Sequence, residues 1–199
     1  MAGRPREFDR DEALKKAQEA FWTRGYEGTS MADLVSALGL ASARIYAAFG
    51  SKEDLFREAV ERYEAEEGSF VARALAEEPL ALGAIERILR DAVDVYTRPG
   101  RPHGCMVVSA ATSCAVENDP VREWLSQRRK IQTTAITDRL KRAVRDGELE
   151  SGTDTQVLGD YVTSVMHGLS VQARDGVSKK RLHALCKLTL QTLSNAAVA

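Results

Sequence analysis

Residues 29–52 read TSMADLVSALGLASARIYAAFGSK, and the rest of the chain is organised around this stretch. Ser30 begins a capping box, and apolar side chains then recur at helical spacing as far as Gly39, a residue type that ends helices. A second apolar pair, Ile45 and Phe49, follows after a short interval. The stretch predicts two short helices joined by a tight turn, an arrangement that presents the second helix to the major groove of DNA.

The residues in and around this stretch resemble the TetR family of bacterial transcriptional repressors. The matching segments are residues 13–26 (ALKKAQEAFWTRGY), residues 28–30 (GTS), the Ile45-Tyr46 and Phe49 run, and the helix start at residues 51–55 (SKEDL). The resemblance implies a repressor that binds DNA as a homodimer until a small effector releases it. The chain departs from the family's usual residues at Ala41 and Ala43-Arg44, so its operator sequence is expected to be its own.

The second short helix is the expected reading surface. The residues on the side opposite Ile45 and Phe49, which would face the groove, are Ser42, Ala43, Arg44 and Ala47. Arg44 is the long donor among them and suits a bidentate contact with guanine, although a phosphate contact is the alternative.

Four further residues are expected at the DNA backbone. Tyr46 and Lys52 match family positions that hold the phosphates, and Lys52 also lies near a helix N-terminus, where amide donors face anions. Thr29 and Ser30 are expected to serve likewise, although helix capping alone would explain both. Residues 1–8 form a basic arm in which Arg4 and Arg6 would reach a minor groove, unless the arm is only a solvated tail.

Composition is ordinary for a globular protein and does not favour DNA binding by itself. The 199 residues are 44% hydrophobic and 29% charged, and 28 Lys and Arg oppose 29 Asp and Glu. Residues 1–52 hold 8 basic and 7 acidic side chains, so the predicted head is not strongly basic. Phosphate contacts depend on where charges are placed, so this balance is neutral evidence.

The rest of the chain shows helical spacing and no alternating strand pattern, which predicts an all-α fold. We expect a helix-turn-helix head at residues 1–50, a connecting helix at 51–67 and a helical ligand-binding and dimerisation domain at 68–199. The expected helices after residue 67 lie at residues 79–97, 105–116 (apolar and buried), 119–147, 153–174 and 178–193.

The last two of these helices are apolar on more than one face, which favours a homodimer built from both. The residues expected at the interface are Val165, Leu169, Leu185 and Leu193. Complete burial of these side chains inside one large core is the alternative.

The effector cannot be named from sequence, because the walls of an apolar pocket and of a core look alike. The side chains proposed to contact it are Cys105, Ser109, Trp124 and Tyr161. His103 and Cys105 would suit a soft metal, but a free cysteine is more often a small core residue, so we predict no metal and no cofactor. The alternative function is a helical small-molecule, metal or redox sensor that does not bind DNA.

Other protein classes are disfavoured. The sequence contains no nucleophile motif, phosphate loop or paired histidines, which argues against an enzyme. Its first residues lack the apolar core of a signal peptide, and the longest apolar run is too short to span a membrane. Three cysteines fit a reducing compartment, so a cytoplasmic protein is expected.

Overall fold

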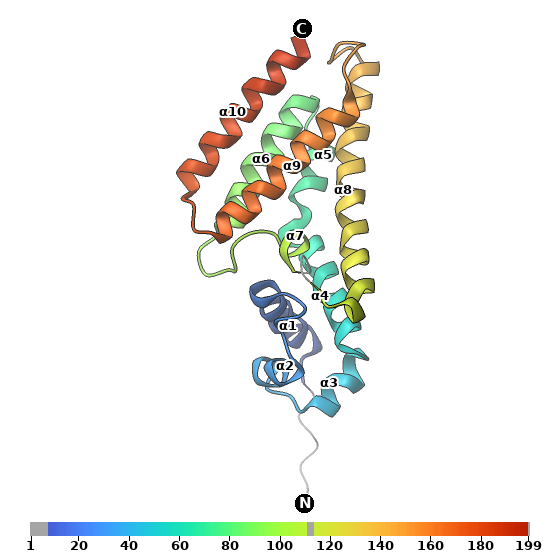
Figure 1. Cartoon of the computed structure of the whole chain (residues 1–199), viewed down its shortest axis with the longest axis vertical. Coiled ribbons are helices and arrows are strands. Elements are labelled where there is room, and N and C mark those ends of the chain that lie inside the picture. The colour runs from blue at the N-terminus through green and yellow to red at the C-terminus, as the bar shows by residue number, and fades with distance from the viewer. Residues whose placement is uncertain (1–7, 111–113, 199) are drawn as a thin grey trace, which may run out of the picture.

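The computed structural model describes residues 8–110 and 114–198, and every regular element within these ranges is a helix (Figure 1). The prediction of an all-α fold is confirmed. The α-helices are α1 Arg10–Arg24, α2 Met31–Leu38, α3 Ser42–Phe49, α4 Lys52–Ala65, α5 Phe70–Glu77, α6 Ala81–Tyr96, α7 Met106–Ser109, α8 Asp119–Arg145, α9 Thr155–Arg174 and α10 Lys179–Val198. Two 3-10 turns, η1 Glu67–Ser69 and η2 Val116–Asn118, precede α5 and α8.

Local sequence explains why α2 and α3 form a sharp corner. Ser30 and Asp33 cap α2 reciprocally, and these hydrogen bonds lower the pKa of Asp33 to about 2. Gly39 ends α2 with a φ of 67°, a left-handed conformation that a residue without a Cβ adopts at little cost. The axes of α2 and α3 meet at 91°. The corner predicted from residues 29–52 is therefore present.

An aromatic cluster fixes this corner to α1 and α4. Phe56 of α4 lies edge-on to Phe21 at 5.1 Å and to Tyr26 at 5.0 Å between ring centroids. Trp22 of α1 contacts Tyr63 of α4 at 4.8 Å. These rings are buried, so α1, α2, α3 and the first half of α4 pack as one unit, which we call the head.

The remaining helices form a larger body. α6 packs against α5, α9 and α10, and α8 runs beside α9 along the edge of the body (Figure 1). α4 runs from the head into the body, where α8 lies alongside it. A displacement of α4 against the body would consequently move the head.

The C-terminal end of α1 is also hydrogen-bonded to the body. The Trp22 indole donates to the Gly104 carbonyl at 3.1 Å, and the Tyr26 amide donates to the Ala110 carbonyl at 2.7 Å. Arg174 of α9 donates to the carbonyls of Trp22 and Thr23. The two Arg174 bonds satisfy carbonyl groups that the C-terminal end of α1 leaves without partners within the helix.

Some predicted boundaries differ from the structure. The run expected to be helical over residues 105–116 is α-helical only over Met106–Ser109 within its described residues. Residues 111–113 lie outside the described part. Val116 begins the 3-10 turn η2 and is 81% exposed rather than buried. Helix α5 was not predicted. The caps of α8 and α9 are Asn118 and Asp154, each one residue from an expected start.

Among the described residues, no single helix is both long and apolar enough to cross a membrane. The bent pair α2–α3 passes the same test by length and composition only.

Candidate DNA-binding surface and effector site

Helix α3 turns one face outward and anchors the other. Ile45 and Phe49 are buried, whereas Ser42, Ala43, Tyr46 and Ala47 are exposed. Tyr46 is 48% exposed. The exposed residues are small except for Tyr46, so the α3 backbone can come close to a binding partner.

The structure contradicts one of the expected DNA contacts, Thr29, and leaves another, Arg44, untested. Thr29 is fully buried and its hydroxyl donates to the Gly25 carbonyl at 2.7 Å, so the expected side-chain contact with phosphate is wrong. Arg44 is half-buried, and its guanidinium lies 4.9 Å from the Phe8 ring centroid. A base contact by Arg44 remains a prediction, and it requires the side chain to leave Phe8.

Ser30 and Lys52 lie beside the corner. Ser30 is exposed and its hydroxyl is held by Asp33 at 2.6 Å, which is a capping role. The Lys52 ammonium lies 4.2 Å above the Tyr26 ring at the start of α4, and partial burial lowers its pKa. Its positive charge is thus held next to the N-terminus of α4, where both the charge and the helix dipole favour an anion.

Arg10 positions the end of α3, a role that the sequence analysis missed. Its guanidinium donates to the Ala48 carbonyl and to Glu58 of α4, and lies 4.5 Å above the Phe49 ring. One side chain of α1 therefore joins α3 to α4. The partners are 38 and 48 residues away in sequence, and no local pattern reveals such a contact.

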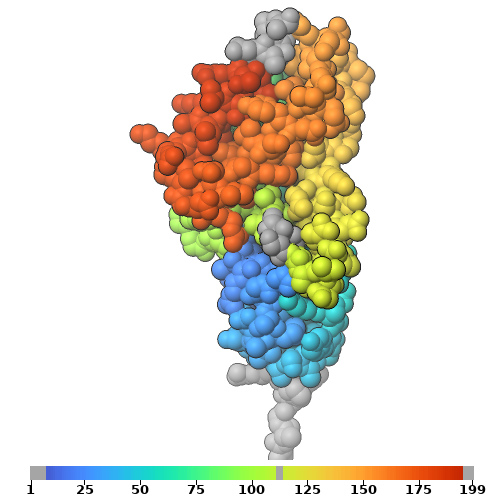
Figure 2. Space-filling view, in the orientation of Figure 1, coloured from blue at the N-terminus to red at the C-terminus, as the bar shows by residue number. Residues whose placement is uncertain are grey.

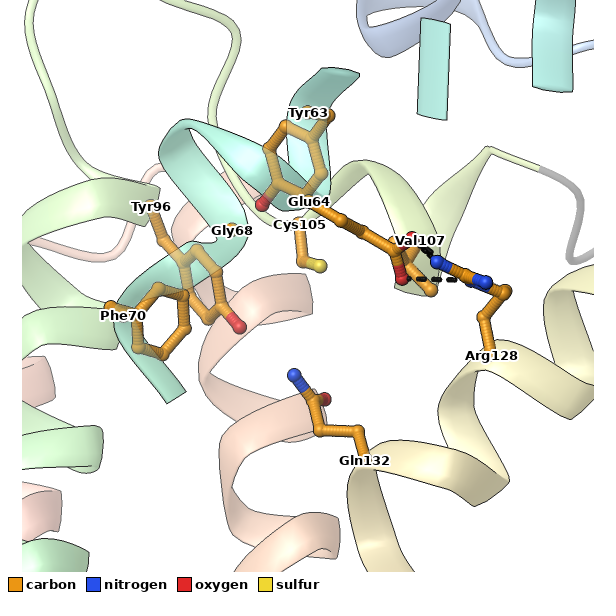
Figure 3. A pocket seen from close by; sticks show the side chains of 9 residues that line it. All are labelled: Tyr63, Glu64, Gly68, Phe70, Tyr96, Cys105, Val107, Arg128 and Gln132. Carbon is orange, nitrogen blue, oxygen red and sulfur yellow. Dashed lines mark hydrogen bonds and ion pairs between the residues drawn. The ribbon is translucent and has the colours of Figure 1, made fainter. Parts of the chain in front are cut away.

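Between α4, η1, α5 and α8 the body contains a small cavity and, next to it, a groove. The cavity is about 20 Å³, and Figure 3 shows its lining residues: Tyr63, Glu64, Gly68, Phe70, Tyr96, Cys105, Val107, Arg128 and Gln132. The groove is about 460 Å³, within the range of small-molecule sites, and shares Glu64, Gly68, Arg128 and Gln132 with the cavity.

The four predicted effector residues do not come together. Cys105 lines the cavity. The centroid of the Trp124 ring lies 5.6 Å from the guanidinium carbon of Arg128, which is another lining residue. Ser109 instead binds the Cys105 carbonyl and Arg174. Tyr161 lies on the exposed side of α9 and lines neither the cavity nor the groove, so its contact with an effector stays a prediction. Arg128 and Glu64, which the sequence patterns did not single out as effector contacts, line both the cavity and the groove.

The chemistry of the cavity disfavours a metal. Burial raises the pKa of the Cys105 thiol, and burial also raises the pKa of Tyr63 and of Tyr96 well above the usual value. All three groups are therefore protonated donors at neutral pH. His103 is exposed while Cys105 is buried, and no group of three His, Cys, Asp or Glu in the described ranges could hold an ion.

Exposed apolar side chains gather on α9 and α10. Val157, Tyr161 and Val171 recur on one side of α9, while Leu185 and Leu188 of α10 are 44% and 61% exposed. Figure 2 shows these two helices as one continuous surface of the body. Val165 is half-buried beside this surface. We call the surface formed by Val157, Tyr161, Val171, Leu185 and Leu188 the C-terminal face.

Two predicted interface residues do not belong to the C-terminal face. Leu169 and Leu193 are 2% and 0% exposed because they pack into the core of the body. Their assignment to the dimer interface is wrong, and the alternative of burial within one core holds for these two. Leu185 does lie on the exposed face.

Comparison with known proteins assigns both parts of the chain. Residues 13–59 match the sequence model described as bacterial regulatory proteins, tetR family, and residues 81–188 match the tetracyclin repressor-like C-terminal domain. The chain belongs to the TetR family. The HTH-type transcriptional repressor ComR of Escherichia coli (strain K12) is 32% identical over 95% of this chain and 90% of its own. BdcR of the same strain, also an HTH-type transcriptional repressor, is 31% identical over 92% of this chain and 88% of its own.

A solved structure agrees with this assignment. The TetR family transcriptional regulator CifR, in a cysteine-substituted form complexed with 26bp double-strand operator DNA, is 41% identical. Its TM-score is 0.91, and the match covers 95% of this chain and 98% of that one.

Family membership confirms the main functional prediction. This TetR family protein is a DNA-binding transcriptional regulator with a helix-turn-helix, and members of the family are dimers that respond to small effectors. The alternative of a sensor without DNA binding is set aside. Regulators of this family are not usually enzymes, in keeping with the expectation from sequence.

Proposed function

We propose that this chain represses transcription by binding an operator as a homodimer, with α3 of each protomer in the major groove, and that an effector in the body releases it. The observation that carries the proposal is the division of α3 into a buried side, Ile45 and Phe49, and an exposed side without bulky charges. Such a helix, set at 91° to α2, has the form that enters a groove 12 Å or so wide.

The contacts at the operator follow from exposure and charge. We assign base-edge and close backbone contacts to Ser42, Ala43 and Ala47, and phosphate contacts to Tyr46 and Lys52. Ser30 contributes through the N-terminus of α2 while capping it. The operator lies in the cytoplasm, where a regulator of this kind acts without catalysis of its own.

The test is a change that leaves the fold intact and spoils the α3 surface. Ala43→Glu places a carboxylate in the first turn of α3, where the helix dipole favours it, so the fold should be unaffected. On DNA it would face phosphates. In fluorescence anisotropy with DNA flanking the protein's own gene, we expect tight binding by the wild type and a loss of at least tenfold in Ala43→Glu.

A matched control shows whether the site or the added charge is responsible. Ala76→Glu adds the same charge at an exposed alanine of α5 in the body. Ala76→Glu should bind the operator as the wild type does. Equal binding by wild type and Ala43→Glu would show that α3 does not read DNA.

A further inference from the structure

The walls of the cavity and groove differ in chemistry from one end to the other. The groove is lined mainly by aliphatic side chains of α5 and α8, namely Val71, Ala72, Leu75, Ile131 and Ala135. At its other end it meets the cavity, where the Arg128–Glu64 ion pair and the Tyr63 phenol lie (Figure 3). A ligand that fills both the groove and the cavity needs an apolar tail and one polar end group.

Hydrogen-bond donors prevail at the polar end. Arg128 donates to both oxygens of Glu64, with Nε at 3.2 Å from Oε1 and 2.9 Å from Oε2. The Tyr63 hydroxyl is buried, makes no hydrogen bond of standard geometry among the described residues and faces the Cys105 thiol, a weak partner; its raised pKa keeps it protonated. A buried donor without a partner costs free energy that an arriving acceptor would recover. The cavity is large enough for one oxygen atom or water.

At the Arg128–Glu64 pair, a negatively charged end group of the ligand is favoured over a positively charged one. Arg128 and Glu64 are exposed to similar extents, 33% and 26%, so exposure alone does not separate the two exchanges. A carboxylate that replaces Glu64 keeps the guanidinium paired and leaves it over the Trp124 ring, whereas an ammonium that pairs with Glu64 displaces Arg128 and breaks this ring contact as well. The first exchange therefore costs less than the second.

We propose that the cavity and groove bind a small amphiphilic carboxylate, whose head group takes Arg128 from Glu64 and whose apolar tail lies along α5 and α8. This inference rests on the proposed function, because it names the class of effector that would act on the regulator.

The ion pair is one end of a stack that reaches the head. The Trp124 ring of α8 is in contact with Arg128 and also with Arg57, whose guanidinium carbon is 5.0 Å from the ring centroid. Arg57 in turn is bonded to Glu53 at 3.0 Å, in the first turn of α4 beside Lys52. The stack ties α4 to α8 at two levels. Loss of the Arg128–Glu64 bond frees the C-terminal half of α4 and lowers operator affinity.

The experiment measures binding of three probes with the same tail, octanoate, octanol and octylamine, to the full-length protein by isothermal titration calorimetry. We expect octanoate to bind at least tenfold more tightly than octanol or octylamine, and acetate to bind at least tenfold more weakly than octanoate because it leaves the groove empty. Octanoate should also lower the affinity of the protein for its operator.

Two variants at the ion pair separate the roles of its members. Glu64→Gln removes the competitor, so octanoate should bind more tightly than to the wild type. Arg128→Gln removes the anion's partner, and octanoate affinity should fall at least tenfold. Thermal melting confirms that each variant is folded, and the Glu64→Gln result stands alone if Arg128→Gln does not fold.

Three results would overturn the inference: no octanoate binding, equal binding of octanoate and octanol, or preferred binding of octylamine that Glu64→Gln abolishes. Operator binding by the ligand-free wild type, measured in parallel, separates this inference from the proposed function. If the operator is bound and octanoate has no effect, only the effector class is wrong.

Discussion

The head and the body of this protein are both helical bundles, but their interiors differ. The head closes over aromatic rings packed edge to face, and among its described residues the buried side-chain atom that lacks a partner is Gln18 Oε1. The body, by contrast, contains Thr137, Thr163 and His167 with unpartnered polar atoms, as well as the cavity beside Tyr63. A nearly complete interior fixes the shape of a reading surface, whereas a less complete one leaves room and polar groups for a ligand.

The largest expected effect removes the centre of the head's aromatic cluster. Phe56→Ala should lower the free energy of unfolding by about 3–5 kcal/mol, because a fully buried ring in contact with Phe21 and Tyr26 is replaced by a cavity. Urea unfolding measures this loss. Phe70→Ala in the body is the matched control, since Phe70 is also buried and packs edge-on to Tyr96.

Operator binding by the two phenylalanine variants tests whether the reading surface depends on the head's own aromatic core. Operator binding is measured without urea, at a temperature at which both variants are folded. Phe56→Ala should weaken operator binding, and the operator affinity of Phe70→Ala should be close to that of the wild type. Equal operator affinity in the two variants would mean that the head does not depend on its own aromatic core.

A smaller effect is expected where the body approaches the head. Gly104 has a φ of 78°, and a Cβ there would lie 2.7 Å from the Ser170 carbonyl oxygen. Gly104→Ala should cost more than about 1 kcal/mol of folding free energy, because it adds a collision to the cost of a left-handed backbone. Gly100 has a φ of 74° with nothing near its Cβ position, so Gly100→Ala measures the backbone cost alone. Equal losses in both variants would contradict the close packing of residue 104.

The body should also be the more pH-sensitive part. Burial, reinforced by the nearby Arg129 charge, lowers the pKa of His167 from 6.5 to about 4. Between these values the unfolded chain binds the additional proton, so this histidine's contribution to stability is complete above pH 6.5 and is lost as the pH falls toward 4. Unfolding of His167→Gln should depend less on pH in this window, while the exposed His103→Gln should behave as the wild type. If the free energy of unfolding of His167→Gln depends on pH as steeply as that of the wild type, the pH dependence arises from other titratable groups.

The smallest expected effect concerns one charge at the head. Lys52→Ala should weaken binding to every DNA sequence alike and lower the slope of log affinity against log salt by about 1, the value for one phosphate contact. Lys141→Ala removes an exposed lysine from α8 and should leave the slope unchanged. An unaltered slope in Lys52→Ala would remove this residue from the interface.

Sequence reasoning succeeded where the information is local. Ser30, Gly39 and the apolar pair Ile45 and Phe49 encode the corner of the head within a few residues, so caps and periodicity suffice to predict it. Such signals also gave α6, α8 and α9 to within a few residues.

It failed where a side chain's role depends on partners far along the chain. The Arg128–Glu64 bond joins residues 64 positions apart, and periodicity places each of them on an ordinary charged helix surface. Leu193 and Leu188 have the same chemistry, yet one is buried in the body and the other is exposed. Two apolar faces on one helix can be predicted from sequence, but which face meets its own chain cannot.

We propose that the C-terminal face joins the two protomers of the homodimer, which places two α3 helices on one operator. Sedimentation of the wild type, Leu188→Asp and Leu80→Asp tests it most directly. Leu188 and Leu80 are exposed to a similar extent, 61% and 59%, but Leu80 precedes α6 and lies outside the C-terminal face.

We predict a dimer for the wild type and for Leu80→Asp, and a folded monomer with weakened operator binding for Leu188→Asp, because an unpaired carboxylate is costly in an apolar interface. A wild type that is monomeric while binding its operator tightly, or a Leu188→Asp variant that remains as dimeric as Leu80→Asp, would contradict the claim.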